Sequence, residues 1–177
     1  VGMIVLEQAT VWARDAGEYL RKGLAARDQF RGHPRVSMIF APHAPYTVAD
    51  DSFREIRLLA NELDTQIHMH VHETASEISA SQKRHARRPL QRLDELGLLT
   101  PLLAAVHMTQ LTAGEIPLLA SRGVSVVHCP ESNLKLASGF CPIADLAAAG
   151  INIALGTDGA SSNNDLDMFG EMRSCAL

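Results

Sequence analysis

Short apolar runs recur along the whole chain and are separated by polar loops and longer amphipathic segments. Consecutive runs begin roughly 20 to 40 residues apart, the spacing of parallel strands joined by helical crossovers. The runs are Met3–Leu6, Val36–Phe40, Thr65–His70, Leu103–His107, Val124–His128 and Ile151–Leu155. The pattern therefore predicts six parallel strands.

The segments between these runs carry the start and stop signals of helices. Ser52–Glu55, Thr74–Glu77 and Thr112–Glu115 match the capping box, in which a hydroxyl and a carboxylate satisfy free backbone amides at a helix start. Gly123 and Gly150 stand where helices are expected to end, just before the next strand. Strand and helix in regular alternation predict a parallel α/β fold.

The choice between an open sheet and a closed barrel depends on where the polar residues fall. No glycine-rich phosphate loop follows any strand, which argues against a nucleotide-binding open sheet. Distinctive polar residues instead follow nearly every strand, as in a (β/α)8 barrel, whose active site is ringed by strand ends. A full barrel needs about 250 residues. The 177 residues are therefore expected to form one domain, a partial barrel with six of its eight strands.

Composition excludes several classes of protein. The chain is 46% hydrophobic with a net charge of −4, so it can bury a core but lacks the basic face of a nucleic-acid-binding protein. No apolar stretch is long enough for a membrane span, and no signal peptide is expected at Val1–Leu6. Three cysteines without paired spacing favour reduced thiols and a cytoplasmic location.

The strongest candidate for chemistry is the segment from Ile67 to Glu73. Alternate side chains of a strand share a face, so His68, His70 and His72 are expected on one side of the sheet. Neutral imidazoles are common zinc ligands, and Glu73 adds a carboxylate directly after them. Such histidines can also be hydrogen-bonded core groups or surface groups. The density of the cluster favours a metal site.

A second candidate is Asp158, where an apolar strand runs into the small and polar residues Gly156–Asp165. A carboxylate at a strand end can ligate a metal and accept a proton from bound water. An Asp-Gly pair is also typical of an ordinary turn or helix cap. His43, between two prolines, and His107, after an apolar run, also follow strands. With His70 and Asp158, four strand ends are expected to direct titratable groups to one rim.

Two further segments have competing interpretations. His128 could be a ligand or could support its loop, and Ser132 and Asn133 could cap a turn or contact substrate. A basic run between residues 83 and 92 is expected to form a solvated helix face. That run contains Lys83, Arg84, His85, Arg87, Arg88 and Arg92.

With these residues placed, the chain resembles the amidohydrolase superfamily, and within it the methylthioadenosine/S-adenosylhomocysteine deaminases near the chlorohydrolase-like branch. The resemblance covers nearly the whole chain, in the family's order. It is carried by APHAPYT at Ala41–Thr47, HMHVHET at His68–Thr74, AVHMT at Ala105–Thr109, HCPESNLKL at His128–Leu136 and GTDGASSNNDLDM at Gly156–Met168.

The resemblance implies a role for each strand-end residue. His70 and Asp158 match metal ligands, and Glu73 matches the general acid/base. His107 matches the histidine that contacts the reacting water, and Asp158 also takes its proton. His43 and Glu73 match substrate-binding residues, and Arg14 matches a residue that meets the ribose or amino-acid tail. The implied cofactor is one divalent metal ion, Zn²⁺, and the implied partner is a small nucleoside substrate.

The family's His-x-His pair on barrel strand one has no match in the chain, which implies that residues 1–177 cover strands three to eight. The first two strands and the family's β-sandwich are expected to be absent, and the isolated chain is expected to be inactive. The implied reaction is hydrolytic deamination of an adenine-type nucleoside, at a C–N bond of a cyclic amidine. Deamination of guanine or cytosine, dechlorination of a triazine, and an inactive fragment remain alternatives, and homo-oligomerisation is left open.

Overall fold

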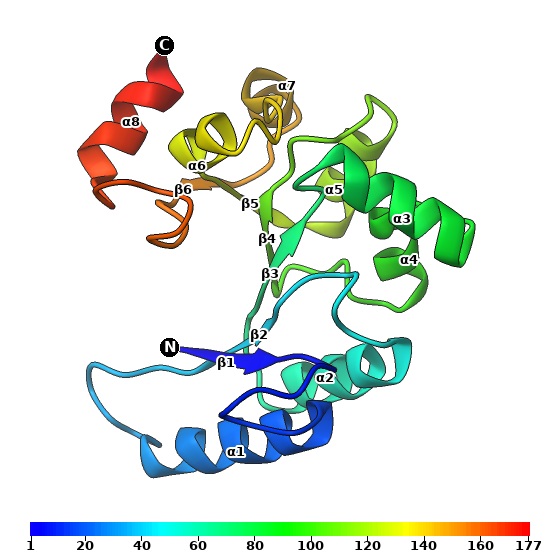
Figure 1. Ribbon diagram of the computed structural model, residues 1–177, viewed down its shortest axis with the longest axis vertical. Helices are drawn as coiled ribbons and strands as arrows, with labels where there is room; N and C mark the ends of the chain where they lie inside the picture. Colours follow the sequence, from blue (N-terminus) through cyan, green and yellow to red (C-terminus); the bar gives the residue numbers. More distant parts are fainter.

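A computed structural model describes residues 1–177, and its centre is one parallel sheet whose six strands are ordered β1-β2-β3-β4-β5-β6, as in the chain. Each strand pairs only with its neighbours in sequence, and the sheet curves into an arc with both chain termini on its open side (Figure 1). The strands are β1 (Gly2–Val5), β2 (Ile39–Pro42), β3 (Ile67–Val71), β4 (Leu103–His107), β5 (Ser125–His128) and β6 (Ile153–Leu155).

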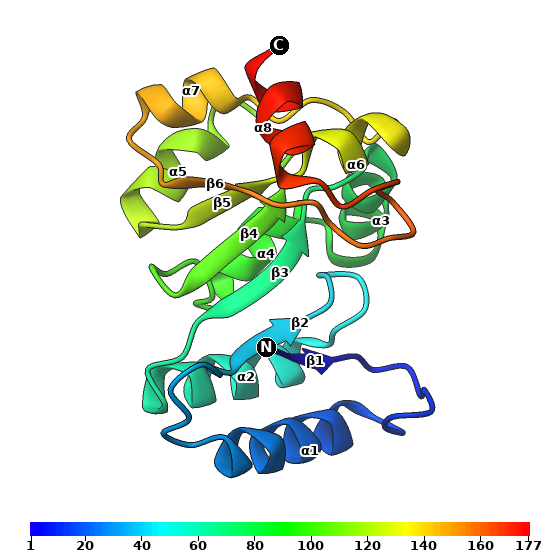
Figure 2. The same cartoon turned by 90° about the vertical axis from the view of Figure 1, so that its left-hand side faces the viewer.

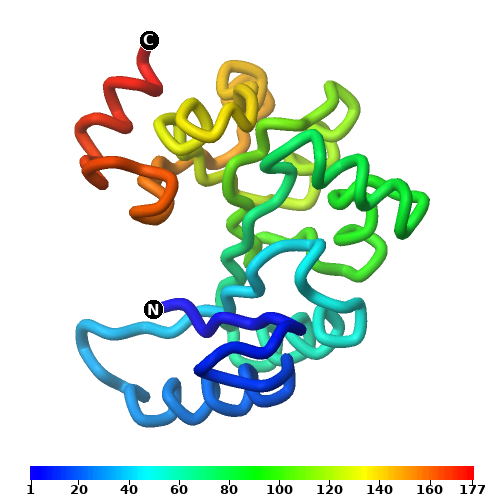
Figure 3. The backbone as a smooth tube through the Cα atoms, viewed as in Figure 1, coloured from blue at the N-terminus to red at the C-terminus, as the bar shows by residue number.

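Eight helices occupy the connections and surround the outside of this arc (Figure 2). The backbone trace shows the same open curve, with the first and last segments facing each other across a gap (Figure 3). The helices are α1 (Ala16–Gln29), α2 (Asp50–Glu62), α3 (Ala75–His85), α4 (Pro89–Glu95), α5 (Glu115–Arg122), α6 (Pro130–Lys135), α7 (Ile143–Ala148) and α8 (Met168–Ala176). No helix is both long enough and apolar enough to cross a membrane.

The predicted strands are all confirmed, with ends that differ by three residues at most. The strand positions that face the helices form one continuous core with them, to which Met69, Val71, Leu103 and Val126 contribute side chains that are almost fully buried. Burial of such a side chain contributes about 1.5–3 kcal/mol. This apolar face fixes the register of the strands, because a slip by one residue would turn it away from the helices.

Parallel pairing places the chemistry-bearing strand ends beside one another. In the register of β3 and β4, His70 lies opposite Val106 and Val71 lies opposite His107. On the other side of β4, β5 pairs with β6, so that His128 lies opposite Leu155, three residues before Asp158. The carboxyl ends of β3 to β6 therefore share one edge, as the barrel architecture requires.

The predicted capping boxes have different outcomes. Thr74 caps α3, where its hydroxyl accepts a hydrogen bond from the Glu77 amide at 3.2 Å. The box at Ser52 is wrong, because α2 begins two residues earlier and the Ser52 hydroxyl donates to Glu7 at 2.7 Å. Thr112 donates to Glu115 at 2.9 Å, but the residue that caps α5 is Gly114.

Local backbone geometry explains why glycine stands at two helix ends. Gly123 and Gly150 have φ of +68° and +74°, in the left-handed region that glycine adopts without a steric penalty, and each follows a helix end.

The basic run between residues 83 and 92 is not uniformly solvated, which corrects the prediction. Arg92 is 4% exposed and donates to Asp50 at 2.7 Å, and Arg88 forms an ion pair with Glu115 at 2.7 Å.

Candidate functional site

Three side chains from separate strand ends converge at the carboxyl edge of the sheet. His70, His107 and Asp158 each offer one ligand atom, and these atoms all lie within 4.8 Å of one another. His70 Nε2 is 3.9 Å from Asp158 Oδ1, and His107 Nε2 is 4.0 Å from Asp158 Oδ2. These separations exceed hydrogen-bond length. We call these three residues the strand-end cluster; its donor atoms face a common point without bonding to one another.

The backbone is unusual at two members of this cluster. His107 and Asp158 have φ of +76° and +60°, which side chains other than glycine rarely adopt. Each such residue costs of order 1–3 kcal/mol and persists only where its surroundings enforce it. Both follow or end a strand, so the strain accompanies the turn that directs their side chains towards the cluster.

The charges of the cluster suit a cation. Burial, and secondarily the charge of His107, lowers the pKa of His70 to about 4, so its imidazole is neutral at pH 7. Burial would raise the pKa of Asp158, but hydrogen bonds from Ser162 and Ser132 outweigh it and the net shift is downward. The cluster therefore presents one carboxylate and a neutral imidazole, both of which are zinc ligands.

The two serine hydroxyls both donate to the same oxygen of Asp158. Ser132 Oγ is 2.7 Å and Ser162 Oγ is 2.5 Å from Oδ2. Oδ1 accepts no hydrogen bond from a side chain and faces His70. The carboxylate is thus held by one oxygen while the other is available to a ligand.

His43, a predicted site residue, lies beside the cluster, and Glu73, another, follows the strand that carries His70. The His43 ring centroid is 5.4 Å from that of His70, and His43 Nδ1 is 3.1 Å from Thr47 Oγ1. Glu73 follows β3 and is partly exposed. Burial and, after it, the negative charge of Glu73 raise the pKa of Tyr46, whose ring lies 6.0 Å from His43.

The loop that carries Glu73 is held by two residues whose roles the sequence did not reveal. The Glu77 carboxylate accepts hydrogen bonds from the backbone amides of His72 at 3.1 Å and Glu73 at 2.8 Å. The Thr109 hydroxyl donates to the Glu73 carbonyl at 2.7 Å. The capping-box signal identified Glu77 as a helix residue, but not as the anchor of the preceding loop.

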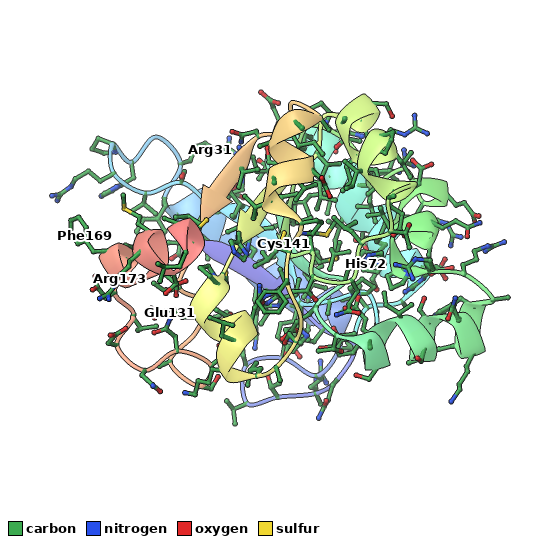
Figure 4. All side chains as sticks on the ribbon, turned by 90° about the horizontal axis from the view of Figure 1, so that it is seen from above. Arg31, His72, Glu131, Cys141, Phe169 and Arg173 are labelled. Carbon is green, nitrogen blue, oxygen red and sulfur yellow. The ribbon has the colours of Figure 1, made fainter.

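Arg14 and His72 lie apart from the cluster. Arg14 is 81% exposed and pairs with Glu18 at 3.0 Å, so its contact with substrate stays a prediction. The expectation that His72 shares a face with His68 and His70 is wrong. β3 ends at Val71, His72 turns with φ of +55°, and its fully buried ring accepts a hydrogen bond from the Leu90 amide at 3.2 Å. Figure 4 shows His72 enclosed among side chains, whereas Phe169 and Arg173 lie at the periphery.

A sizeable cavity lies away from the strand-end cluster. It has a volume of about 470 Å³, lies between α6, α7 and α8, and reaches the neighbourhood of the cluster only through His128 and Asn133. Cys141 and Cys175 also line it. We therefore identify the candidate site from converging side chains and not from cavity size.

The chain is similar in sequence to known deaminases over most of its length. The chain is 55% identical over 173 residues to a 5-methylthioadenosine/S-adenosylhomocysteine deaminase of Teredinibacter turnerae, covering 98% of this chain and 39% of that protein. It is 46% identical over 143 residues to a 5'-deoxyadenosine deaminase of Methanothermobacter thermautotrophicus, covering 81% of this chain and 34% of that protein. The chain thus spans about 40% of the length of the curated relatives it matches.

Solved structures agree in fold. An adenosine deaminase from Xanthomonas campestris with bound zinc superposes with a TM-score of 0.97 at 56% identity, over 99% of this chain and 40% of that chain. The zinc complex of an atrazine chlorohydrolase from Arthrobacter aurescens superposes with a TM-score of 0.91 at 22% identity, over 98% of this chain and 41% of that chain. The first likeness extends to sequence, and the second shows the shared fold alone.

The architecture and the motifs therefore agree with the resemblance seen in the sequence. The six sequential parallel strands form part of a (β/α)8 barrel, as predicted. The model of the amidohydrolase family matches residues 13–177, and the chain belongs to that family.

Proposed function

We propose that this chain carries catalytic residues of a zinc-dependent deaminase that converts an adenine-type nucleoside, methylthioadenosine or S-adenosylhomocysteine, to the inosine-type product and ammonia. The observation that carries the proposal is the convergence of His70, His107 and Asp158 at one edge of the sheet. The supporting comparison is the 55% identity to a deaminase of that specificity. We assign the six strands of this chain to strands three to eight of the barrel.

The residues present fit a zinc ion. In our assignment His70 Nε2 and Asp158 Oδ1 would hold it, because these atoms face each other at 3.9 Å without hydrogen bonding. Catalytic zinc normally takes three protein ligands, and the resemblance assigns the others to a histidine pair on strand one. When bound, zinc lowers the pKa of its water to about 7 and so supplies a nucleophile at neutral pH.

The chain's own side chains would move the protons. Asp158 is kept anionic by Ser132 and Ser162 and can accept a proton from the attacking water. His107 presents Nε2 to the same point and can orient that water. Glu73, on the loop anchored by Glu77, would donate a proton to N1 of the purine, so that C6 can accept the oxygen of the water. The C6–N bond would then break, and the amino group would leave as ammonia with the proton that Asp158 had accepted.

The proposed substrate contacts lie around these groups. His43, which stands edge-on to His70, is assigned to substrate binding, and Arg14 is assigned to the ribose or amino-acid tail. A small nucleoside is the only partner that the proposal requires. A cytoplasmic location remains a prediction that rests on three free cysteines.

The test is a product assay on the protein in its natural length. Methylthioadenosine, S-adenosylhomocysteine, 5'-deoxyadenosine, guanine, cytosine and atrazine are offered in parallel, and ammonia or chloride release is followed with zinc content. We expect ammonia from the adenine nucleosides alone. We expect Glu73→Gln to keep zinc and lose about 10²–10⁴-fold in rate, the scale of a general acid–base group. Chloride release from atrazine, or zinc loss in Glu73→Gln, would refute the assignment.

A further inference from the structure

Asn133 lies between two strand-end histidines and contacts both. It belongs to α6 and is 3% exposed. Its Oδ1 is 2.9 Å from Nδ1 of His107, at the end of β4, and its Nδ2 is 3.5 Å from Nδ1 of His128, at the end of β5. One carboxamide thus bridges the ends of two neighbouring strands.

The backbone gives this side chain little freedom. The Asn133 amide donates to the Cys129 carbonyl at 3.0 Å, and the Asn133 carbonyl accepts from the Ser138 amide at 2.9 Å. Pro130 opens the helix, and a proline there presets the backbone for the first turn. Because its backbone is held in this way, Asn133 is a fixed hydrogen-bonding partner for the two imidazole rings.

The chemistry of the contact selects one form of His107. An amide oxygen only accepts hydrogen bonds, so Oδ1 requires a proton on His107 Nδ1. A neutral imidazole carries one proton, and Nε2 is then left with a free lone pair. Nε2 is the atom that faces Asp158 at 4.0 Å.

If the carboxamide were turned over, its Nδ2 would face His107 and donate to Nδ1, which gives a poorer arrangement. The proton of a neutral His107 would then be on Nε2, directed at the point shared with His70 and Asp158. Asp158 Oδ2 lies 4.0 Å from that nitrogen, beyond hydrogen-bond length, and already accepts from two serine hydroxyls. The orientation with Oδ1 towards His107 leaves no such unpaired N–H.

We propose that Asn133 is a positioning residue, which fixes His107 as the Nδ1-protonated tautomer so that Nε2 can accept a hydrogen bond at the reaction centre. This inference rests on the proposed function for its kinetic consequence but not for its structural content. It replaces the two interpretations that the sequence left open for Asn133, a turn cap and a substrate contact. A partner of this kind typically contributes 10–100-fold to metal affinity or activity.

The primary test is ¹⁵N NMR of the histidine rings in the natural-length protein, with and without zinc. We expect His107 to show a protonated Nδ1 and an unprotonated Nε2. Asn133→Asp keeps an acceptor for Nδ1–H and should retain this tautomer. Asn133→Leu removes the acceptor and should give the averaged shifts of an unconstrained ring. A proton on Nε2 of His107 in the unaltered protein would overturn the proposal outright, even if a variant fails to fold.

Kinetics add a second readout. We expect Asn133→Leu to lower kcat by about 10–100-fold with KM changed much less, because the buried carboxamide acts through the two imidazole rings that it contacts. Asn133→Asp should recover most of that loss, and Asn61→Asp, at an exposed position of α2, is the matched control. Equal activity in Asn133→Leu and the unaltered protein would refute the positioning role. Absence of deaminase activity in the unaltered protein would instead refute the proposed function and leave the NMR result standing.

Discussion

Two histidines at the end of β3 each lie near a carboxylate, and the two pairs have different surroundings. His70 Nε2 lies 3.9 Å from Asp158 in the strand-end cluster, and His72 Nε2 lies 3.9 Å from Glu115 on the helix side of the sheet. In the second region Arg88 forms two bonds to Glu115, at 2.7 and 3.0 Å. We call His72, Arg88 and Glu115 the buried cluster.

The difference lies in charge balance. In the buried cluster the carboxylate has its own cation, and the His72 ring is neutral because burial lowers its pKa to about 4. In the strand-end cluster the side chains that donate to Asp158 are serine hydroxyls, and no lysine or arginine pairs with it. A histidine beside a carboxylate is therefore not by itself a metal site. The missing positive charge is what distinguishes a cation site from a structural network.

The largest expected effect comes from breaking the strand-end cluster. We expect His70→Ala to lose bound zinc and at least about 10⁴-fold in deaminase rate, the upper end for one acid–base group, because ligand and nucleophile are lost together. Zinc content and kcat of the natural-length protein measure this. His33→Ala, at an exposed position, is the control. Retention of stoichiometric zinc by His70→Ala would place the metal elsewhere.

Glu115→Gln breaks the buried cluster instead. Arg88 loses its charged partner, so the free energy of unfolding should fall by about 2 kcal/mol while zinc content stays the same. Urea unfolding measures the change. Glu95→Gln is the matched control, because Glu95 pairs with Arg87 at a surface where an ion pair contributes about 0–1 kcal/mol. Loss of zinc in Glu115→Gln would erase the distinction between the two clusters.

The pH dependence of stability should report on the buried ring of His72. Its folded pKa is about 4, below the ordinary 6.5, so between these values the unfolded chain binds more protons and stability falls as pH falls. One proton corresponds to at most about 1.4 kcal/mol per pH unit. His72→Gln should reduce the slope of unfolding free energy between pH 7 and 5 by up to that amount. An unchanged slope, with His33→Gln as control, would contradict a neutral buried His72.

The smallest expected effect on stability comes from Thr74, which follows His70 and His72 in the chain and caps α3. Thr74→Ala removes the cap of α3 and should lower the free energy of unfolding by about 1 kcal/mol. The rate should hold, because Glu77 still anchors the amides of His72 and Glu73. Unfolding and kcat are compared with those of Ser79→Ala, an exposed position of the same helix. A rate loss as large as that of Glu73→Gln would show that Thr74, and not Glu77, positions the loop.

Much of this arrangement follows from local pattern. The six apolar runs and the polar residues after them predicted the sheet and the meeting of His70, His107 and Asp158, because side chains at parallel strand ends share an edge. His72 escaped the prediction for a physical reason. Alternation holds only while the strand continues, and β3 ends one residue before it.

The supporting hydrogen bonds could not be predicted in the same way. Ser132 approaches Asp158 from α6 and Ser162 approaches it from the loop after β6, while Asn133 of α6 contacts His107 at the end of the neighbouring strand β4. Ser132 and Asn133 are distant in sequence from their partners, whereas Ser162 is close to Asp158, and a serine or asparagine after a strand is equally typical of an ordinary turn. Only the three-dimensional pairing of β4, β5 and β6 brings Ser132 and Asn133 to Asp158 and His107.

The order of the strands has a consequence for biosynthesis. Because every strand pairs with the one made just before it, each βα unit can dock on a preceding unit as the chain leaves the ribosome, without waiting for a distant segment. The strand-end cluster is the exception, because it needs Asp158, which follows the last strand, β6, in the chain. A nascent chain can thus acquire most of its hydrogen-bonded sheet while Asp158 is still unmade, and the capacity to bind metal arrives late in translation of these residues.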